Sequence, residues 1–257
     1  MIFSKYHGTG NDFIMIDNRS ADIKLSQPQI EHLCHRRFGI GADGLILLEN
    51  GVERLTMVYY NSDGRQSSMC GNGGRCFARF AKDLGLVKND VVEFDAIDGW
   101  HQANFDGDNV ILQMKNCEGF SISDDGFVLD TGSPHFVKFV PSDFWDDGEF
   151  VNTARAIRNR PLFKEKGINV NYISETGKGK LKIRTFERGV EDETYSCGTG
   201  VTAAALVYGS RNDLNEVKLE SKGGNLTVSF RRNSDGIFTD VFLKGPAVKV
   251  FEGEIIL

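Results

Sequence analysis

The sequence contains no long apolar run and no block of charge of one sign. No window approaches the roughly 18 apolar residues that a membrane-spanning helix requires. The first residues, Met1 to Lys5, lack a basic stretch followed by an apolar one, so we expect no leader peptide and a cytoplasmic protein. The 30 Lys and Arg residues are interspersed with 36 Asp and Glu residues, which leaves a net charge of −6. This balance argues against nucleic acid and anionic membranes as partners.

Cysteine and proline are scarce. The 5 Cys residues are an odd number at irregular spacings in a chain large enough to build a core without crosslinks, so we expect reduced thiols rather than a disulfide framework. Only 5 residues are Pro, while 40% are hydrophobic and 26% are charged, which is typical of a folded globular protein. Glycine is plentiful at 29 residues, which indicates close backbone approaches.

Short motifs recur at a spacing close to half of the chain. The matching pairs are His7 and His135, Gly39-Ile40 and Gly167-Ile168, and Cys70-Gly-Asn-Gly and Cys197-Gly-Thr-Gly. A period this long makes the repeating unit a whole domain rather than a solenoid repeat. We therefore predict two similar halves related by a pseudo-twofold axis. Residues 1–116 form the lobe that carries Cys70, and residues 117–257 form the lobe that carries Cys197, with the last strand free to pack on the first lobe.

Periodicity predicts the elements of each half. Short segments rich in Val, Ile, Phe and Tyr predict strands over 12–17, 44–49, 54–60, 91–97, 109–114, 127–130, 135–140, 168–173, 180–186, 217–220, 225–231 and 237–243. Apolar residues at helical spacing predict helices over 27–36, 73–84, 152–159 and 199–209. Two of these helices each follow a Cys-Gly pair. The predicted class is α+β with two similar lobes.

The two Cys-Gly-x-Gly motifs carry the chemistry. A Cys directly before a helix places its sulfur beside backbone N–H groups and the positive end of the helix dipole, which lowers a thiol pKa. The same N–H groups bind anions, and Gly lets a ligand carboxylate approach the backbone. A single such Cys could equally be an inert buried residue. Two of them, at equivalent positions of a repeated domain, favour a shared functional site.

Two thiols that flank one small carboxylate predict a particular reaction. One thiolate removes the α-proton while the other thiol delivers a proton to the opposite face, which inverts the stereocentre. N–H groups and helix dipoles stabilise the enolate-like charge, so neither a metal nor pyridoxal is needed in principle. The spaced glycines after His7 and Gly39 are too weak a signal for a dinucleotide site. We therefore expect no cofactor and no metal.

Seven motifs, two of which contain the Cys-Gly-x-Gly sequences, run in order along nearly the whole chain: HGTGNDF (7–13), NSDG (61–64), CGNGGRCFARF (70–80), SPH (133–135), INV (168–170), ERG (187–189) and CGTG (197–200). This set resembles the diaminopimelate epimerase family. The resemblance implies a cytoplasmic, cofactor-independent isomerase that interconverts LL- and meso-diaminopimelate for lysine and peptidoglycan precursor synthesis. It also implies a homodimer, and lobes in which a strongly curved sheet or barrel surrounds a central helix.

The resemblance also implies roles for individual residues. Cys70 and Cys197 resemble the catalytic acid and base, which exchange roles with the direction of the reaction. His135 and Glu187 resemble polar neighbours that tune the two thiols. Nine positions resemble the family's substrate-binding residues: Asn11, Asn61, Gly71, Asn72, Asn169, Glu187, Arg188, Gly198 and Thr199. Those beside the two cysteines would offer N–H groups to the reacting carboxylate, and Arg188 suits the far carboxylate because its planar fork binds bidentately.

Some features depart from the family's pattern. Gly44 stands where Gln is frequent, Ser133 stands where Asn is common, and the stretch from Glu187 to Cys197 is one residue longer than usual. These departures concern details of substrate contact rather than the Cys-Gly motifs.

Other interpretations remain open. A proline- or hydroxyproline-type racemase would use the same two thiols but would not need Arg188, and a phenazine-type isomerase of the same fold lacks the thiols. A non-enzymatic redox sensor or ligand-binding module would use the cysteines in disulfide exchange. Cys34, His32 and His35 resemble a metal group, but no second cluster at zinc-finger spacing follows, so we expect incidental ligands on a helix.

Overall fold

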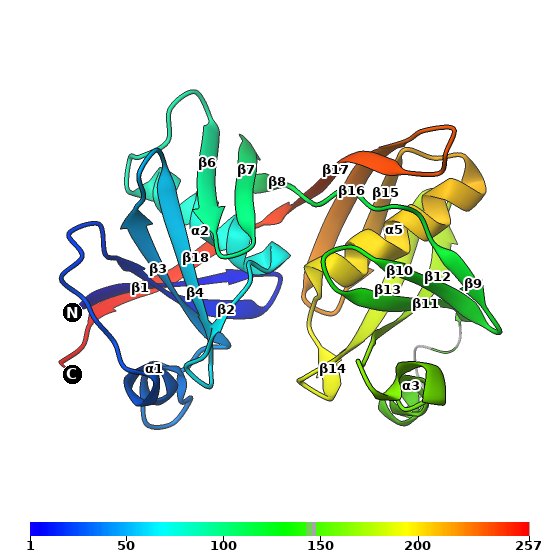
Figure 1. Cartoon of the computed structure of the whole chain (residues 1–257), viewed down its shortest axis with the longest axis horizontal. Helices are drawn as coiled ribbons and strands as arrows, with labels where there is room; N and C mark the ends of the chain where they lie inside the picture. Colours follow the sequence, from blue (N-terminus) through cyan, green and yellow to red (C-terminus); the bar gives the residue numbers. More distant parts are fainter. Residues whose placement is uncertain (143, 145–147, 257) are drawn as a thin grey trace. The chain divides into compact units, whose positions relative to one another are not determined.

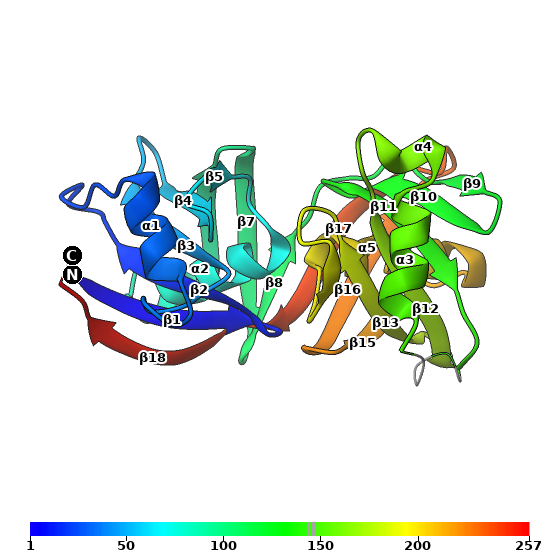
Figure 2. The same ribbon diagram turned by 90° about the horizontal axis from the view of Figure 1, so that it is seen from below.

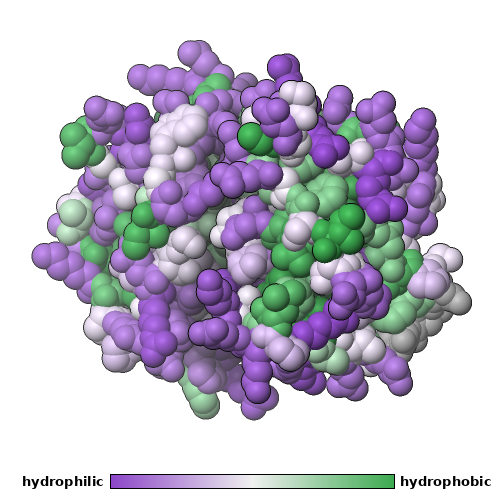
Figure 3. All heavy atoms as spheres, turned by 45° about the vertical axis from the view of Figure 1, so that its right-hand side comes forward, coloured by the Kyte–Doolittle hydropathy of each residue, from purple (hydrophilic) through white to green (hydrophobic). Residues whose placement is uncertain are grey.

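A computed structural model describes residues 1–142, 144 and 148–256. The chain divides into two compact units: Met1–Leu112 together with Gly245–Leu257, and Gln113–Lys244 (Figure 1). The C-terminal segment therefore belongs with the N-terminal residues. Within the described residues, no helix is both long enough and apolar enough to cross a membrane. Figure 3 shows polar side chains over most of one face, with apolar side chains in smaller groups between them.

The first unit arranges its strands around one helix. Its elements are β1 (Ile2–Gly8), β2 (Asn11–Asp17), α1 (Gln27–Cys34), β3 (Gly44–Asn50), β4 (Leu55–Asn61), β5 (Gln66–Ser67), α2 (Gly71–Asp83), β6 (Val91–Ala96), β7 (Gly99–Asp106), β8 (Asn109–Gln113) and, from the C-terminus, β18 (Val248–Glu254). Strands β2 and β3 are parallel, as are β4 and β6, whereas β1 pairs antiparallel with both β2 and β18. Figure 1 shows these strands around α2.

The burial of α2 explains its central position. Residues on several sides of this helix are buried, including Arg75, Phe77 and Ala81, and the helix packs against β1, β2, β3 and β18. Strand residues alternate between two faces. In β2, Phe13 and Met15 lie in the core, while Ile14 and Ile16 pack in the separate cluster that includes Ile30 of α1. The sheet is therefore covered on both faces.

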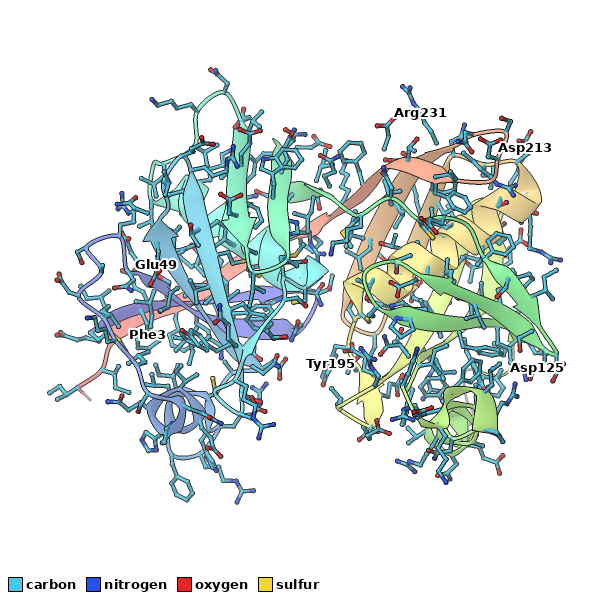
Figure 4. The ribbon with its side chains drawn as sticks, in the orientation of Figure 1. Phe3, Glu49, Asp125, Tyr195, Asp213 and Arg231 are labelled. Carbon is cyan, nitrogen blue, oxygen red and sulfur yellow. The ribbon has the colours of Figure 1, made fainter. Side chains whose placement is uncertain are left out.

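The second unit repeats this plan. Its elements are β9 (Ser121–Ser123), β10 (Gly126–Asp130), β11 (Pro134–Phe139), α3 (Phe150–Arg158), α4 (Pro161–Lys164), β12 (Asn169–Gly177), β13 (Lys180–Glu187), β14 (Asp192–Thr194), α5 (Gly198–Asn212), β15 (Glu216–Ser221), β16 (Gly224–Arg232) and β17 (Phe238–Pro246). Helix α5 is buried along most of its length and packs on β10 to β13, β15 and β16. Its C-cap is Asp213, labelled in Figure 4, whose φ is +53°.

Helices α3 and α4 cover the other face of β11, β12 and β13 (Figure 2). Phe136, Val170 and Phe186 of these strands pack against them in one apolar cluster. Because strand residues alternate between faces, the neighbours His135, Asn171 and Thr185 point to the opposite face, toward α5. Asp125 in the β9–β10 turn, labelled in Figure 4, accepts hydrogen bonds from Arg160 and Lys138 and ties this turn to the start of α4.

The two units share one connectivity. In each, an antiparallel hairpin leads to a parallel neighbour, a second hairpin follows, and a central helix leads to a further parallel strand (β1 to β6 and β10 to β15). The predicted α+β class with two similar lobes around central helices is confirmed. Cys70 and Cys197 occupy equivalent positions, because each is the N-cap of its unit's central helix.

The other repeat pairs were wrong. His135 lies on β11 and pairs with Asn169, whereas Phe13 on β2 pairs with Gly44, so the counterpart of His135 is Phe13. His7 lies on β1, which corresponds to β10. Gly39 likewise sits in the loop after α1, bonded to the His35 carbonyl, and does not directly precede a strand as Gly167-Ile168 does. Loops of different length produced these two matches in spacing.

The expected elements are present, with shifts of a few residues at their ends. The patterns missed β1, β5, β7, β9, β14, β18 and the short helix α4. Strand β18 is mostly exposed and lacks the alternation of a half-buried strand. Its place is fixed instead by pairing with β1, where Phe251 meets the edge of Phe3 at 5.9 Å between ring centroids (Phe3 is labelled in Figure 4).

Candidate active site

Cys70 starts the central helix of the first unit. Its extended backbone (φ −106°, ψ 151°) places the sulfur beside the first turn of α2, where Sγ accepts a hydrogen bond from the Gly73 N–H at 3.2 Å. A Cβ on Gly73 would lie 3.1 Å from this sulfur, so glycine leaves room for the thiol. N–H groups at the start of a helix point toward whatever binds there. The geometry expected from the first Cys-Gly-x-Gly motif is therefore present.

Asn72 and Asn11 meet next to Cys70. Asn72 Nδ2 donates to Asn11 Oδ1 at 3.3 Å, while Asn72 Oδ1 accepts from Arg75 Nη2 at 2.9 Å. Asn11 Nδ2 in turn donates to Asp43 Oδ2 at 2.7 Å. These bonds fix the direction of both amides and bring three expected site residues, Cys70, Asn72 and Asn11, into one group.

Asp43 is part of a charged network that sequence reasoning missed. Arg36 donates to the carboxylates of both Asp12 and Asp43, each at 2.7 Å. Lys5 forms an ion pair with Asp12 at 2.7 Å and also donates to the Gly41 carbonyl. Burial alone would raise the pKa of Asp12, but Arg36 and Lys5 lower it to about 2. Asp12 therefore stays charged at neutral pH, and the network holds Asp43 against Asn11.

Arg75 is a second residue that the patterns did not single out. It is fully buried one turn after Cys70 and donates to the Gly71 carbonyl at 3.1 Å and to Thr9 Oγ1 at 3.3 Å. Its Nε lies 3.4 Å from the Pro246 carbonyl. Burial lowers the pKa of Arg75 to about 10, which still leaves it charged at neutral pH. Arg75 thus joins the start of α2 to the β1–β2 turn and to the C-terminal segment.

Asn61 and Gly44 lie opposite each other on β4 and β3. Asn61 is exposed at the end of its strand, where its backbone makes a turn with Arg65 and Gly64. A Cβ on Gly44 would lie 2.6 Å from the Tyr60 carbonyl oxygen and from the Tyr59 ring. A longer side chain at position 44 therefore requires a local shift of the backbone, which explains why glycine fits here.

Cys197 starts the central helix of the second unit and is 9% exposed. Its Sγ lies 3.4 Å from Thr199 Oγ1. The Val201 N–H donates to the Cys197 carbonyl at 2.9 Å, and Thr131 donates to the Thr199 carbonyl at 2.8 Å, so the first turn of α5 is held at both ends. Gly198 and Thr199 are the first residues of this helix, as Gly71 and Asn72 are in the first unit.

His135 lies beside this thiol and is completely buried. Its Nε2 is 2.9 Å from Thr199 Oγ1 and 3.1 Å from Ser133 Oγ. Burial, with a smaller effect of Arg188, lowers the pKa of His135 to about 3. The ring is therefore neutral at neutral pH. Ser133 is in direct contact with His135, so this departure from the family's pattern sits inside the site.

Asn169 holds the backbone of Arg188. Its Oδ1 accepts the Arg188 N–H at 2.8 Å, and its Nδ2 donates to Ser133 Oγ at 2.9 Å and to the Pro134 carbonyl at 3.2 Å. Both amide protons are thus used within the protein. Only Oδ1 has capacity left for a ligand. The Arg188 side chain is exposed and donates from Nη1 to the Lys166 carbonyl at 3.0 Å.

Glu187 is half-buried at the end of β13, and its Oε1 accepts the Thr194 hydroxyl at 2.6 Å. The longer stretch between Glu187 and Cys197 forms a turn, with the Glu191 N–H bonded to the Glu187 carbonyl at 2.8 Å, and then strand β14. Tyr195, which follows β14 and is labelled in Figure 4, is 57% exposed. Within this unit, all the expected residues lie near the start of α5 or at the ends of β11 to β13.

The remaining cysteines have a different environment. Cys34 and Cys76 are buried, and burial raises the pKa of Cys34 to about 12 and that of Cys76 further. Burial also raises the pKa of Cys117. Cys34, the last residue of α1, packs in the core, and no group of three potential metal ligands is found among the described residues.

Comparison with known proteins places this geometry in a family. The family described as diaminopimelate epimerase matches residues 3–117 and 127–250. The diaminopimelate epimerase of Flavobacterium psychrophilum is 50% identical over 256 residues, which cover 98% of each chain. That of Chlorobaculum tepidum is 41% identical and covers 97% of this chain and 99% of its own.

Solved structures agree on the fold alone, because their sequences are distant. A PhzF-family phenazine biosynthesis protein from Bacillus anthracis has a TM-score of 0.77 at 14% identity, covering 100% of this chain and 99% of its own. A hydroxyproline epimerase from Agrobacterium vitis has a TM-score of 0.70 at 13% identity, covering 99% and 90%. The full-length sequence matches decide the assignment: the chain belongs to the diaminopimelate epimerase family of isomerases.

Proposed function

We propose that the protein interconverts LL- and meso-diaminopimelate by two-thiol acid-base chemistry, without a cofactor. The activity follows from its family, whose members match along the whole chain. One observation carries the mechanism: each unit's central helix begins at a Cys N-cap followed by Gly and a polar residue. A chain that needed one inert buried Cys would not place a second at the equivalent helix start.

The proposed site binds the reacting carboxylate at these helix starts. The N–H groups of Gly71, Asn72, Gly198 and Thr199 are the proposed donors, and the helix dipoles favour negative charge there. When the α-proton leaves, negative charge spreads into the carboxylate as an enolate forms. Donors already aimed at that position stabilise the transition state more than the ground state.

The two proton transfers balance without any other reactant. The thiolate of one cysteine takes the α-proton as the Cα–H bond breaks, and the thiol of the other gives its proton to the opposite face of the same carbon. The cysteines thereby exchange protonation states, and the reverse reaction uses them in the opposite roles. The other expected residues bind the remaining groups: Arg188 takes the far carboxylate, while Asn11, Asn61, Asn169 and Glu187 contact the amines and the far end of the substrate.

A hydroxyproline- or proline-type racemase is the second candidate, because a hydroxyproline epimerase shares the fold. The position of Arg188 argues for a substrate with a second charged end. Its backbone is fixed by Asn169, and its exposed side chain is directed by the Lys166 carbonyl. A planar guanidinium suits a carboxylate, and proline has no second carboxylate to bind.

Exchange of the α-proton tests this function. The protein is incubated in deuterated water with LL-diaminopimelate, meso-diaminopimelate, proline and hydroxyproline in separate reactions, and deuterium at the α-carbon is followed by mass spectrometry. We expect deuterium only with the two diaminopimelates, together with formation of the other stereoisomer. Exchange with proline alone would favour the racemase, and no exchange with any of them would favour a redox or binding module.

Two further properties are proposed from the family resemblance. A homodimer predicts twice the mass of the 28.6 kDa chain in light scattering coupled to gel filtration. A cytoplasmic location predicts that the protein fractionates with cytoplasmic markers when its source cells are lysed.

A further inference from the structure

A buried polar side chain outside the expected set lies behind Cys197. Asn171 is on β12, two residues after Asn169, and is completely buried. It points toward α5 between His135 of β11 and Thr185 of β13. Its Nδ2 lies 3.0 Å from His135 Nδ1, and its Oδ1 accepts the Thr185 hydroxyl at 2.9 Å. A buried amide held by these contacts determines which neighbouring groups donate hydrogen bonds and which accept them.

The Phe136 carbonyl decides which way the Asn171 amide points. This carbonyl oxygen lies 3.2 Å from Asn171 Nδ2. A carbonyl oxygen only accepts hydrogen bonds, so the amide group facing it is the NH2 group and not the oxygen. The same NH2 group faces His135 Nδ1. The orientation therefore does not depend on how the Thr185 hydroxyl is turned.

This orientation sets the tautomer of His135. Because Asn171 donates to Nδ1, that nitrogen carries no proton, and a neutral ring must carry its proton on Nε2. Burial of the ring keeps it neutral at neutral pH. The Nε2–H then points at Thr199 Oγ1, 2.9 Å away, with Ser133 Oγ also in reach at 3.1 Å.

The tautomer in turn directs the Thr199 hydroxyl. Its oxygen receives the His135 proton, so its own proton must go to another acceptor. Cys197 Sγ is 3.4 Å away, a good distance for a bond to sulfur, whereas Ser133 Oγ at 3.5 Å is long for a bond between hydroxyls. The hydroxyl proton therefore points at the sulfur.

We propose that Asn171 is a positioning residue that, by holding His135 as its Nε2–H tautomer, makes the Thr199 hydroxyl donate to the Cys197 sulfur. A donor aimed at the sulfur favours the thiolate, which is the form that accepts the substrate proton. The proposal deepens the proposed function and rests on Cys197 being one of its two thiols. It gives three residues, Asn171, Thr185 and Thr199, a positioning role that they exert through hydrogen bonds.

The second glycine of the second motif, Gly200, fits this role. A Cβ on Gly200 would lie 2.4 Å from Asn171 Oδ1. Glycine at the equivalent position of the first motif, Gly73, instead leaves room for the sulfur of Cys70. The two motifs thus use glycine for different reasons, and in the second unit the space is occupied by the amide that controls His135.

Asn171→Asp is the sharpest test because it reverses the direction of the hydrogen bonds between Asn171, His135 and Thr199. A carboxylate only accepts hydrogen bonds. It would therefore favour the tautomer of His135 whose Nδ1–H donates to it, which leaves Nε2 without a proton and able only to accept. Thr199 would then donate to His135 instead of to sulfur. Thr199→Val removes the hydroxyl altogether, and Thr199→Ser restores it. Thr202→Val is the matched control, because this buried Thr lies on the same helix but bonds only the Gly198 carbonyl at 2.9 Å.

Two measurements read the outcome on the intact protein without substrate. The pH dependence of iodoacetamide alkylation, followed by mass spectrometry of the Cys197 peptide, gives the pKa of that thiol. A hydrogen bond to a charged group is typically strong enough to shift it by about one to two units. We expect the pKa of Cys197 to rise by that amount in Asn171→Asp and Thr199→Val but not in Thr199→Ser or Thr202→Val. Nitrogen-15 NMR of the imidazoles should show the Nε2–H tautomer of His135 in the wild type and its loss in Asn171→Asp.

The proposal is overturned if wild-type His135 carries its proton on Nδ1, or if the Cys197 pKa is the same in the wild type and Thr199→Val. Thr199→Val leaves Asn171 unchanged, so it gives an answer even if Asn171→Asp does not fold. Because neither readout uses diaminopimelate, a missing epimerase activity with the expected pKa and tautomer changes would count against the proposed function only.

Discussion

The side chain of Arg188 passes directly over the backbone of Gly167. A Cβ on Gly167 would lie 2.6 Å from Arg188 Cδ, and the backbone there has a φ of +73°. Together with the bond from Arg188 Nη1 to the Lys166 carbonyl, this contact fixes where the guanidinium points. The turn before β12 therefore shapes the residue proposed to bind the far carboxylate.

Gly167→Ala should raise KM for diaminopimelate several-fold with a smaller change in kcat. The added methyl group displaces Arg188, which is proposed to bind the substrate end that does not react. Gly179→Ala is the matched control, because its φ is +71° but its nearest neighbour to a Cβ is 3.7 Å away. Both variants carry the same backbone strain, of about 1 kcal/mol. Equal KM values in the two variants would show that Gly167 does not position Arg188.

Arg188→Lys should weaken substrate binding because a point charge does not replace a bidentate fork. The expected loss is roughly 1.5 to 3 kcal/mol, the usual strength of a hydrogen bond to a charged group, or about ten- to a hundredfold in KM. The control for the change of cation is Arg231→Lys, because the side chain of Arg231, labelled in Figure 4, is 81% exposed. An unchanged KM would mean that the far carboxylate is bound elsewhere.

Arg75→Lys should destabilise the first unit without a matching effect from Arg79→Lys on the same helix. A lysine cannot make the separate bonds to Thr9, Gly71 and Asn72 at once, and polar groups left unpaired in the core cost free energy. We expect a loss of ~3 kcal/mol, which lowers Tm by on the order of 5 to 10 °C. Thermal unfolding checks this, and equal Tm values for the two variants would contradict it.

Hydrophobic periodicity and the motifs were sufficient to predict the two central helices and the positions of Cys70 and Cys197 at their starts. The Cys-Gly-x-Gly motif predicted these helix starts correctly because the thiol, the small residues and the first helical N–H groups are neighbours in the sequence. Equivalent spacing was a poorer guide: His7 and His135 match only because insertions shift the strands relative to the helices. Register between strands, which the sequence does not display, identified Phe13 as the true counterpart of His135.

The supporting residues were harder to find because they act through space. Asp43 reaches Asn11 from the loop directly before β3, and Arg75 looks like an ordinary polar residue of a helix until its full burial is seen. Asn171 carried one usable signal: it lies two residues after Asn169, so a strand places both on the same face. The same argument links Thr185 to Glu187. Only the sheet pairing shows that these faces meet at the start of α5.

Cys70→Ala and Cys197→Ala should each abolish epimerisation and leave the unfolding transition intact. The mechanism needs an acceptor and a donor at once, and loss of a general acid or base costs at least ~10²- to 10⁴-fold. Cys34→Ala and Cys117→Ala should remain active, because burial raises the pKa of both thiols and neither starts a helix. Turnover close to wild type in either of the first two variants would end the two-thiol mechanism.

The burial of His135 should make stability depend on pH in a defined range. Its folded-state pKa is about 3, below the ~6.5 of an unfolded chain, so below pH 6.5 the unfolded state binds a proton that the folded state does not. The free energy of unfolding should therefore fall as the pH falls from 6.5 toward 3, by up to ~1.4 kcal/mol per pH unit from this group.

The substitution His135→Gln tests this because it removes the titrating ring but keeps a hydrogen-bond donor near Thr199. Urea unfolding at pH 7, 6 and 5 should show the stability gap between wild type and variant shrinking by about 2 kcal/mol over this interval. A constant gap would mean that His135 binds its proton equally well in both states, and the neutral ring on which the hydrogen bonds to Thr199 and Cys197 depend would lose its support.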